Sequence, residues 1–250
     1  MVVFNSNEMT STIQNFTAGY EALAKKGLPA ALGIQQNVLN TPMGKCFAIG
    51  FMWSSPDLDA GRKYLDQITS FGRVIHNGVK EMTIPEWMEA ITTFAPKVAY
   101  GRNCTINLRK LTEEVNIVIG REIDRMPDDR STLLSIHQLR GPSEAANANS
   151  VFGARTAHYC LEFIATSSEQ ERAKAVWDWA VRFRDAIRKT DAQNILTSTY
   201  ISLTPPTEAS SPAIYGDNWE KLVEIKRQYD PKNVFKHALP KFTEMAIKED

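Results

Sequence analysis

The chain has 250 residues, and its 29 Lys and Arg residues are balanced by 29 Asp and Glu residues, so the formal net charge is zero. A neutral chain gives no electrostatic reason to expect binding to nucleic acid or to an acidic membrane surface. No apolar run has the length of a membrane span, and the first residues lack the basic and apolar parts of a signal peptide, so we expect a cytoplasmic protein. The three cysteines are widely spaced within apolar patterns, which favours buried thiols over disulfides, and the Asp, Glu and His spacings show no metal site.

Hydrophobic periodicity in the first half of the chain predicts strands and amphipathic helices in turn. Segment Lys97–Leu108 is ambiguous. In chain order we expect a strand at Val2–Phe4, a helix at Glu8–Lys26, strands at Ala30–Val38 and Lys45–Trp53, a helix from Pro56 to Thr69, a strand at Arg73–Met82 and a helix from Thr83 to Thr92.

The second half continues this pattern, and its clearest helix, Ser167–Lys189, has acidic residues early and basic residues late, as the helix dipole favours. The other predicted elements are a helix at Thr112–Met126, strands at Thr132–Leu139 and Val151–Ala165 joined by the polar loop Arg140–Ser150, a strand at Ile195–Leu203 and a loop at Pro205–Pro212. We expect residues 1–250 to form a single α+β domain. Its antiparallel sheet would have about seven strands, with helices covering one face.

Segment Tyr215–Phe235, which closes the predicted domain, combines a helix with a firm stop. Asp217 or Asn218 can cap the helix start, and Asp230-Pro231 ends it because proline lacks an N–H group. Val234 and Phe235 are expected to form a buried anchor after the helix.

This segment, with its pattern Tyr-Gly-x-Asn-Trp-x-x-Leu-x-x-Ile-Lys-x-x-Tyr-Asp-Pro-x-Asn-x-Phe, resembles the closing motif of the berberine-bridge-type FAD-linked oxidases. The chain is similar to the substrate domain of these enzymes, and especially to fungal members, from end to end. Val151-Phe152-x-x-Arg155 resembles the family's Ala-Phe-Pro-His-Arg, and Tyr200-Ile-Ser-Leu resembles its Tyr-Leu-Asn-Tyr. The resemblance implies an antiparallel substrate domain that, in the full-length enzymes, packs against an FAD-binding domain.

Two features set the sequence apart from these oxidases. The sequence has no GxGxxG-type loop for a pyrophosphate, and it begins directly at the substrate domain, so we expect no flavin and no other cofactor. Aligning the strands also places Leu161 and Leu203 where the family has a catalytic Glu and Tyr. We therefore expect the ancestral redox chemistry to have been lost.

The residues expected to form the site lie on four of the predicted strands. His137 occupies the place of a substrate-facing Tyr in the family, although a buried core histidine is the ordinary alternative. Arg155 either polarises a substrate carbonyl or is a structural residue of its motif, and Tyr159 can donate through its hydroxyl. These three are the predicted catalytic residues; the predicted substrate-binding residues are Cys46, Ala48, Gly50, Met52, Trp53, Ser135, Leu139, Leu161, Phe163, Tyr200 and Leu203. His158 is expected to point the other way, towards the helices.

These expectations favour a cofactor-free cyclase acting on a small hydrophobic polyketide or terpenoid substrate. A Diels–Alder or hetero-Diels–Alder reaction suits such a pocket, because positioning alone supplies much of the acceleration, and dehydration to a quinone methide can precede it. Two alternatives remain open at this point: the substrate subunit of a split FAD-dependent oxidase, and a non-catalytic protein that binds a hydrophobic metabolite. We also expect a homodimer, because an uncovered apolar sheet face is rare in monomers.

Overall fold

The computed structural model describes residues 1–92, 98–145, 150–205, 208 and 210–237. Its centre is an eight-stranded sheet in the order β4-β1-β3-β2-β6-β7-β5-β8, in which every neighbouring pair is antiparallel. The strands are β1 (Val2–Phe4), β2 (Leu32–Thr41), β3 (Gly44–Trp53), β4 (Val74–Asn77), β5 (Tyr100–Leu108), β6 (Thr132–Leu139), β7 (His158–Ser167) and β8 (Ile195–Leu196). The α+β class and the antiparallel sheet are thus confirmed, with one strand more than expected.

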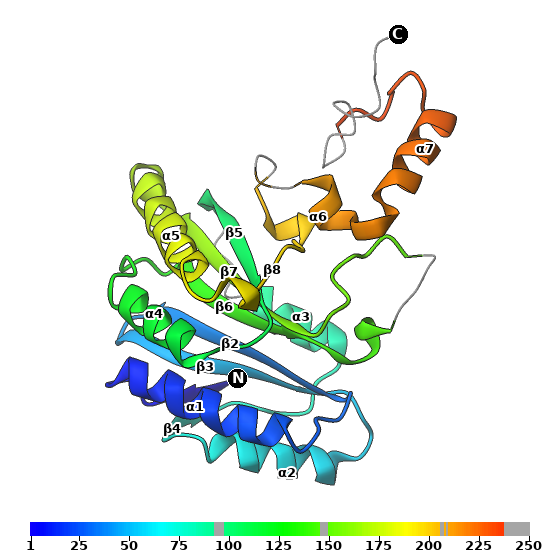
Figure 1. Ribbon diagram of the computed structural model, residues 1–250. Coiled ribbons are helices and arrows are strands. Elements are labelled where there is room, and N and C mark those ends of the chain that lie inside the picture. Colours follow the sequence, from blue (N-terminus) through cyan, green and yellow to red (C-terminus); the bar gives the residue numbers. More distant parts are fainter. Residues whose placement is uncertain (93–97, 146–149, 206–207, 209, 238–250) are drawn as a thin grey trace.

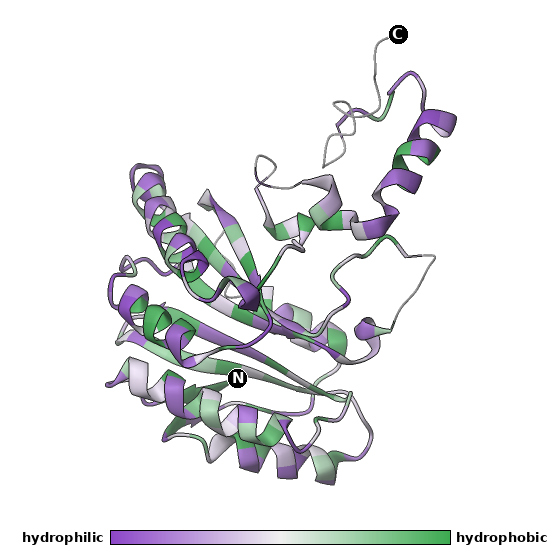
Figure 2. Ribbon diagram, viewed as in Figure 1, coloured by the Kyte–Doolittle hydropathy of each residue, from purple (hydrophilic) through white to green (hydrophobic). Residues whose placement is uncertain are grey.

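Four helices cover one face of this sheet: α1 (Met9–Ala24), α2 (Leu58–Thr69), α4 (Glu113–Asp124) and α5 (Ala173–Arg188). Figure 2 shows that hydrophobic and hydrophilic residues alternate around α4 and α5, so that each helix has one apolar side. The sequence expectations for all four helices hold, although α5 begins later than Ser167 because Ser167 still belongs to β7. The cap at Thr112 is present, since its hydroxyl accepts a hydrogen bond from the backbone N–H of Val115 at 3.3 Å.

The hydrophobic core lies between the helices and the sheet, and it contains packed aromatic rings towards both ends of the sheet. Near the N-terminal strands the ring of Phe16 on α1 contacts Phe47 on β3 edge-on, with centroids 5.2 Å apart. At the other end Phe163 on β7 meets Phe183 on α5 in the same manner, at 4.8 Å. Gly120 allows α4 to approach α1 closely, because a Cβ there would lie 2.3 Å from the Thr10 hydroxyl.

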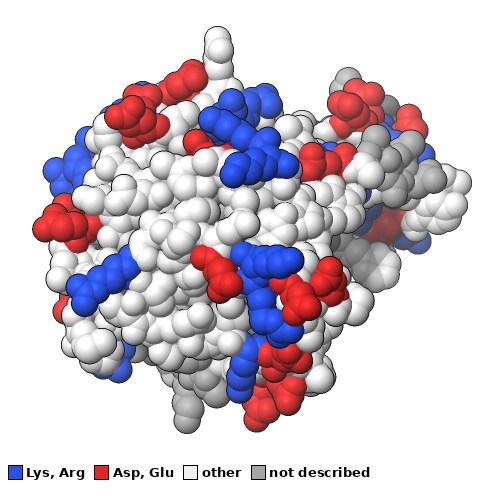
Figure 3. Space-filling model, turned by 90° about the horizontal axis from the view of Figure 1, so that it is seen from below, with Lys and Arg blue, Asp and Glu red and all other residues white. Residues whose placement is uncertain are grey.

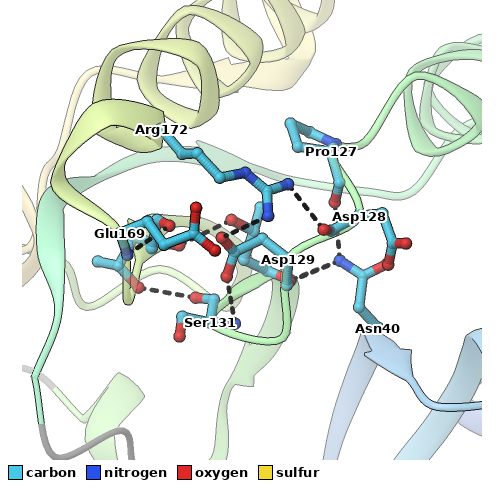
Figure 4. A network of polar contacts seen from close by, with 10 residues as sticks. Asn40, Pro127, Asp128, Asp129, Ser131, Glu169 and Arg172 are labelled. Atoms are coloured by element: carbon cyan, nitrogen blue, oxygen red, sulfur yellow. Dashed lines mark hydrogen bonds and ion pairs between the residues drawn. The ribbon is translucent and has the colours of Figure 1, made fainter.

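A polar network fixes the turn between α4 and β6 at one end of the sheet (Figure 4). The side-chain amide of Asn40 donates to the carbonyl oxygens of Pro127 and Asp129 at 2.9 and 2.8 Å. Arg172 donates to the Asp128 carbonyl at 2.7 Å and lies 3.6 Å from the Asp129 carboxylate. These bonds tie β2 and the start of α5 to one turn and thereby fix the end of the sheet.

Three predicted strands are shorter than expected. β4 covers only Val74–Asn77 of the predicted Arg73–Met82, and β7 and β8 are shorter because neighbouring residues make other contacts. β7 begins at His158, not at Val151, because the preceding segment packs as a loop against the C-terminal part of the chain: a Cβ on Gly153 would lie 3.0 Å from the Ile214 carbonyl oxygen. β8 ends at Leu196 instead of Leu203, since Asn107 binds the Ser198 carbonyl oxygen at 2.9 Å.

The C-terminal part of the chain contains α6 (Ser211–Tyr215) and α7 (Trp219–Tyr229), and α7 projects away from the body of the molecule (Figure 1). The closing helix is where the motif predicted it. Its expected side-chain cap is absent: Asn218 instead donates to the Ser150 carbonyl oxygen at 2.8 Å. The expected buried anchor is also wrong, since Val234 and Phe235 are 69% and 76% exposed.

The remaining helix, α3 (Ile84–Thr92), connects β4 and β5, which lie near opposite edges of the sheet. Its predicted position is confirmed, and Lys97–Leu108, which was ambiguous, provides β5 from Tyr100 onwards. Residues 97, 146–149, 206, 207 and 209 of the predicted segments lie outside the described residues. None of the described helices is both long and apolar enough to cross a membrane.

Candidate active site

The face of the sheet that points away from α1, α2, α4 and α5, here called the outer face, carries a row of polar side chains. Directly paired residues on neighbouring strands share a face, so the register shows which side chains meet there. On this face Gln35 of β2 lies opposite His137 of β6, and Ser135 of β6 lies opposite Glu162 of β7. Strand β5 adds Thr105, which pairs with Glu162.

Apart from Thr105, these side chains form one hydrogen-bonded chain that continues to Asn103 of β5 and so crosses four adjacent strands. The amide of Gln35 donates to Ser135 Oγ at 2.7 Å, and Ser135 Oγ lies 3.3 Å from His137 Nε2. The same Nε2 is 3.0 Å from Glu162 Oε2. The chain ends at β5, where the Asn103 amide donates to Glu162 Oε1 at 2.9 Å.

Burial differs between the two ionisable members of this chain. The Glu162 side chain is only 8% exposed, whereas the His137 side chain is 31% exposed. Both carboxylate oxygens of Glu162 accept hydrogen bonds, so the group is well satisfied in its buried position. His137 is therefore the member of the pair that a bound molecule can reach.

The hydrogen-bond pattern argues against a serine or cysteine nucleophile. In a catalytic triad the serine and the acid contact different ring nitrogens of the histidine, whereas here Ser135 and Glu162 meet the same Nε2. Cys160 lies opposite His137 on the same face, but burial, and after it the Glu162 charge, raises the pKa of the Cys160 thiol to about 12. The arrangement instead suits an acid–base pair in which the carboxylate orients an imidazole.

Several predicted residues do lie on the outer face with His137. They are Ser135 and Leu139 on β6, and Cys46, Ala48, Gly50 and Met52 on β3. The β3 residues flank Gln35 and Asn37 of β2, so small side chains adjoin the polar row.

Four predicted site residues lie on the opposite, helix-covered face, and their placement at the site was wrong. Tyr159, Leu161 and Phe163 point into the core, where Leu161 and Phe163 are fully buried. The Tyr159 hydroxyl accepts from the Gln138 amide at 3.4 Å, and burial raises its pKa. Trp53 stacks on Tyr64 of α2 with ring centroids 5.6 Å apart.

The error in β7 is a shift of one residue, which exchanges the two faces of a strand. The outer face carries His158, Cys160 and Glu162, so His158 faces away from the helices, contrary to expectation. Leu161, which aligns with the catalytic Glu of the family, faces the core, and the acidic residue of this strand, Glu162, is its neighbour on the outer face.

Arg155, Tyr200 and Leu203 lie outside the strands: Arg155 is in a loop, and Tyr200 and Leu203 are at the start and end of a short 3-10 helix. The Arg155 guanidinium donates to Ser143 O and Ser150 Oγ at 3.0 and 2.6 Å, which makes it a structural residue of its own loop. Tyr200 and Leu203 belong to a segment that meets the outer face at β5, where Thr204 Oγ1 lies 3.2 Å from Thr105 Oγ1. Neither of them contacts His137 among the described residues.

Sequence reasoning missed Glu162, Asn103 and Gln35. For Glu162 a signal existed, because a carboxylate inside the apolar run His158–Phe163 requires a partner. Asn103 and Gln35 are ordinary polar residues, and only the strand register brings them together.

The described residues do not fit the diphosphate of FAD. In such sites a glycine-rich loop between a strand and a helix presents backbone N–H groups to the phosphates. The connections from β1 to α1, β3 to α2, β5 to α4 and β7 to α5 contain no glycine, and the connection from β4 to α3 contains a single one, Gly78. Glycines with positive φ occur singly, at well-separated positions of the chain. Among the described residues no three His, Cys, Asp or Glu side chains gather as metal ligands.

The surface charge does not indicate a second binding site on the side seen in Figure 3. Figure 3 shows basic and acidic side chains interspersed on the visible side, with neither sign dominating.

Comparison with known proteins supports the resemblance found in the sequence. Residues 203–240 match the family described as "Berberine and berberine like". The chain is 26% identical over 219 residues to the FAD-linked oxidoreductase aurO of Gibberella zeae, a match that covers 86% of this chain and 42% of that protein.

Solved structures of this fold include aclacinomycin oxidoreductase, with a TM-score of 0.69 at 17% identity, and 6-hydroxy-D-nicotine oxidase from Arthrobacter nicotinovorans, with 0.71 at 12%. Each match covers 95% of this chain; it covers 54% of aclacinomycin oxidoreductase and 53% of 6-hydroxy-D-nicotine oxidase. The chain thus spans about half the length of the structures that it matches. The resemblance to the substrate-domain half of berberine-bridge-like FAD-linked oxidases is confirmed.

Proposed function

We propose that this chain, given its relationship to the berberine-bridge-like FAD-linked oxidases, is an enzyme of secondary metabolism in which His137 and Glu162 transfer protons during ring closure. The observation that carries the proposal is the 3.0 Å contact between His137 Nε2 and Glu162 Oε2. A carboxylate that accepts a hydrogen bond from Nε2–H favours the tautomer with its proton on Nε2, and Nδ1 is then the basic atom. Among the described residues Nδ1 has no hydrogen-bond partner.

The proposed reaction begins with loss of water from a hydroxylated aromatic substrate. Nδ1 of His137 takes the proton of a phenolic hydroxyl, and the imidazolium, stabilised by Glu162, returns that proton to a hydroxyl on the adjacent benzylic carbon. The C–O bond breaks, water leaves, and a quinone methide remains. The step is redox-neutral and needs no oxidant.

The quinone methide then closes a ring with an alkene in a hetero-Diels–Alder reaction. Two σ bonds form and no atom is lost, so the protein needs only to hold the partners in a reactive geometry. Small and apolar outer-face residues such as Ala48, Gly50 and Leu139 suit a flat hydrophobic substrate. Arg155 and Tyr159, which were expected to bind the substrate oxygen, have no part in this mechanism.

The test uses the purified chain, a 2-(hydroxyalkyl)phenol and an electron-rich alkene, with the cyclic ether measured by liquid chromatography and mass spectrometry. Substituting His137→Gln or Glu162→Gln should lower the rate by about 10²-fold or more, the usual contribution of general acid–base catalysis. Tyr159→Phe is a matched control, because this residue is a neighbour in sequence but lies on the helix-covered face, and it should leave the rate unchanged. Equal rates for all variants would refute the proposal.

A second candidate function is the substrate-binding half of an FAD-linked oxidoreductase, which the similarity to aurO favours. In that case turnover would require added FAD and would consume oxygen. The proposed dehydration and ring closure would proceed without either, so oxygen consumption distinguishes the two.

A further inference from the structure

Among the described residues, two groups of exposed hydrophobic side chains lie outside the sheet. The first is on α3, where Ile84, Trp87, Met88 and Ile91 are 76%, 41%, 46% and 41% exposed. Their spacing of three and four residues places them on one side of the helix. We call this set the α3 stripe.

The α3 helix is locally well formed although its apolar side is exposed. The Glu86 carboxylate accepts from the Thr83 backbone N–H and hydroxyl, each at 2.7 Å, which forms the return half of a capping box. These bonds from Thr83 hold the pKa of Glu86 below its usual value. Pro85 lies in the first turn, where its missing N–H costs nothing. The stripe is therefore a defined surface and not a frayed end.

The second surface belongs to residues 219–237, here called the C-terminal arm, which projects from the body (Figure 1). Its exposed apolar residues are Ile225, Tyr229, Val234 and Phe235, at 42%, 76%, 69% and 76%. The end of the arm is folded back by Asp230, which accepts from the N–H groups of Val234 and Phe235 at 2.7 and 3.0 Å. The Lys226 ammonium group forms an ion pair with Oδ2 of the same carboxylate. The two hydrophobic side chains are thus presented outwards by an ordered turn.

The charges of the two surfaces are complementary. Residues 79–92, which include the α3 stripe, contain one basic and three acidic residues, a net charge of −2. Residues 219–237 contain Lys221, Lys226, Arg227, Lys232 and Lys236 against Glu220, Glu224 and Asp230, a net charge of +2 with His237 neutral. An acidic apolar stripe and a basic apolar arm on one molecule suit reciprocal contact between two identical chains.

We propose that two copies of this chain form a dimer in which the C-terminal arm of each copy packs on the α3 stripe of the other. This arrangement covers both apolar surfaces at once and closes on itself, so it does not continue into a fibre. It also differs from the expected dimer through an apolar sheet face, because a row of polar side chains crosses the outer face. The helices α1, α2, α4 and α5 occupy one side of the sheet, and Figure 1 shows α3 behind it, on the other side. The arm of the second copy therefore lies on the side of the sheet that carries His137 and Glu162.

Analytical ultracentrifugation of the purified chain should give twice the 28.1 kDa chain mass. Trp87→Asp and Phe235→Asp should each convert the dimer to monomer, because each places a charge in an apolar contact. Ile117→Asp is the matched control: Ile117 is 52% exposed on α4, outside both surfaces, and its replacement should leave the dimer intact.

Charge reversal tests which surfaces meet. One variant carries Glu81→Lys and Glu89→Lys, and the other carries Lys221→Glu and Lys232→Glu. Each variant alone should be monomeric, since its stripe and its arm then have the same sign. An equimolar mixture should form a heterodimer, because both of its contacts again join opposite signs. A monomeric native chain, or a mixture that stays monomeric, would overturn the proposal; neither result depends on catalytic activity.

Discussion

Asn103 is the residue that should tune the Glu162 carboxylate most directly. Its amide donates to Oε1 at 2.9 Å while His137 meets Oε2, so the carboxylate is held from both sides. Asn103→Asp would place a second carboxyl beside Glu162, and two such groups at this distance favour sharing one proton. We expect this change to lower the ring-closure rate at least tenfold, and Asn103→Ser to have a much smaller effect. Rate measurements for both variants over a pH series check this, and equal effects would contradict it.

The three thiols should differ in reactivity. Burial raises the pKa of Cys104 and, with the charge of Glu162, that of Cys160, in both cases to about 12, so neither forms thiolate near neutral pH. Burial raises the pKa of Cys46 as well, but this residue is only partly buried and is open to reagent. A thiol-reactive dye at pH 8 should therefore label Cys46 alone in the native protein and all three residues after denaturation. Labelling of native Cys46→Ser would show that this assignment is wrong.

At the level of elements, Glu122 joins α4 to α5. Its buried carboxylate lies 3.0 Å from Arg121, 2.9 Å from Arg125 and 3.2 Å from Arg182. Burial alone would raise the pKa of Glu122, but the hydrogen bonds from Arg182 and Arg121 outweigh it, and the pKa is lowered.

We expect Glu122→Gln to lower the free energy of unfolding by about 1.5–3 kcal/mol, the usual contribution of hydrogen bonds to a charged group. Because the pKa is lowered in the folded state, this stabilisation is present above the unfolded-state pKa and is lost as the pH falls through the folded-state value. Urea denaturation at neutral and acidic pH measures both effects. The exposed Glu113→Gln serves as control and should change little.

The C-terminal turn should also respond to acid. The bond from Lys226, and after it those from Val234 and Phe235, hold the pKa of Asp230 low. The turn is therefore stable above the unfolded-state pKa of Asp230 and opens as the pH falls through the lowered value. Asp230→Ala should accelerate hydrogen exchange at the Val234 and Phe235 amides at neutral pH, whereas Lys232→Ala should not. Unchanged exchange in Asp230→Ala would mean that the turn is held by other contacts.

The sequence predicted elements well where only one face of a strand is apolar. In β6 the alternation of Leu134 and Ile136 with Ser135 and His137 identifies the outer face directly. In β7 residues 158–163 are all buried, so alternation disappears, and the face inferred from the family resemblance is the opposite of the observed one. The pairing of Gln35 with His137 joins residues about a hundred positions apart, and periodicity alone cannot supply such a register.

The exposed hydrophobic residues were missed for a different reason. Val234 and Phe235 have the composition of a core anchor, but hydrophobic side chains are common on protein surfaces and the rule that places them inside works in one direction only. The helical pattern of α3 likewise indicated an apolar side without showing what covers it.

For the whole molecule, the decisive question is whether these 250 residues bind FAD. The described strand-to-helix connections that lead into α1, α2, α4 and α5 lack glycine, so no nest of backbone N–H groups meets a diphosphate there. We therefore expect the purified chain to be colourless and added FAD to keep its free fluorescence. An equal amount of the FAD-linked oxidoreductase aurO provides the positive control. A visible flavin band in the purified chain, or fluorescence quenching on titration with FAD, would instead favour the oxidoreductase candidate. His137 and Glu162 would then be the acid–base groups of a redox reaction, and the ring-closure proposal would fail.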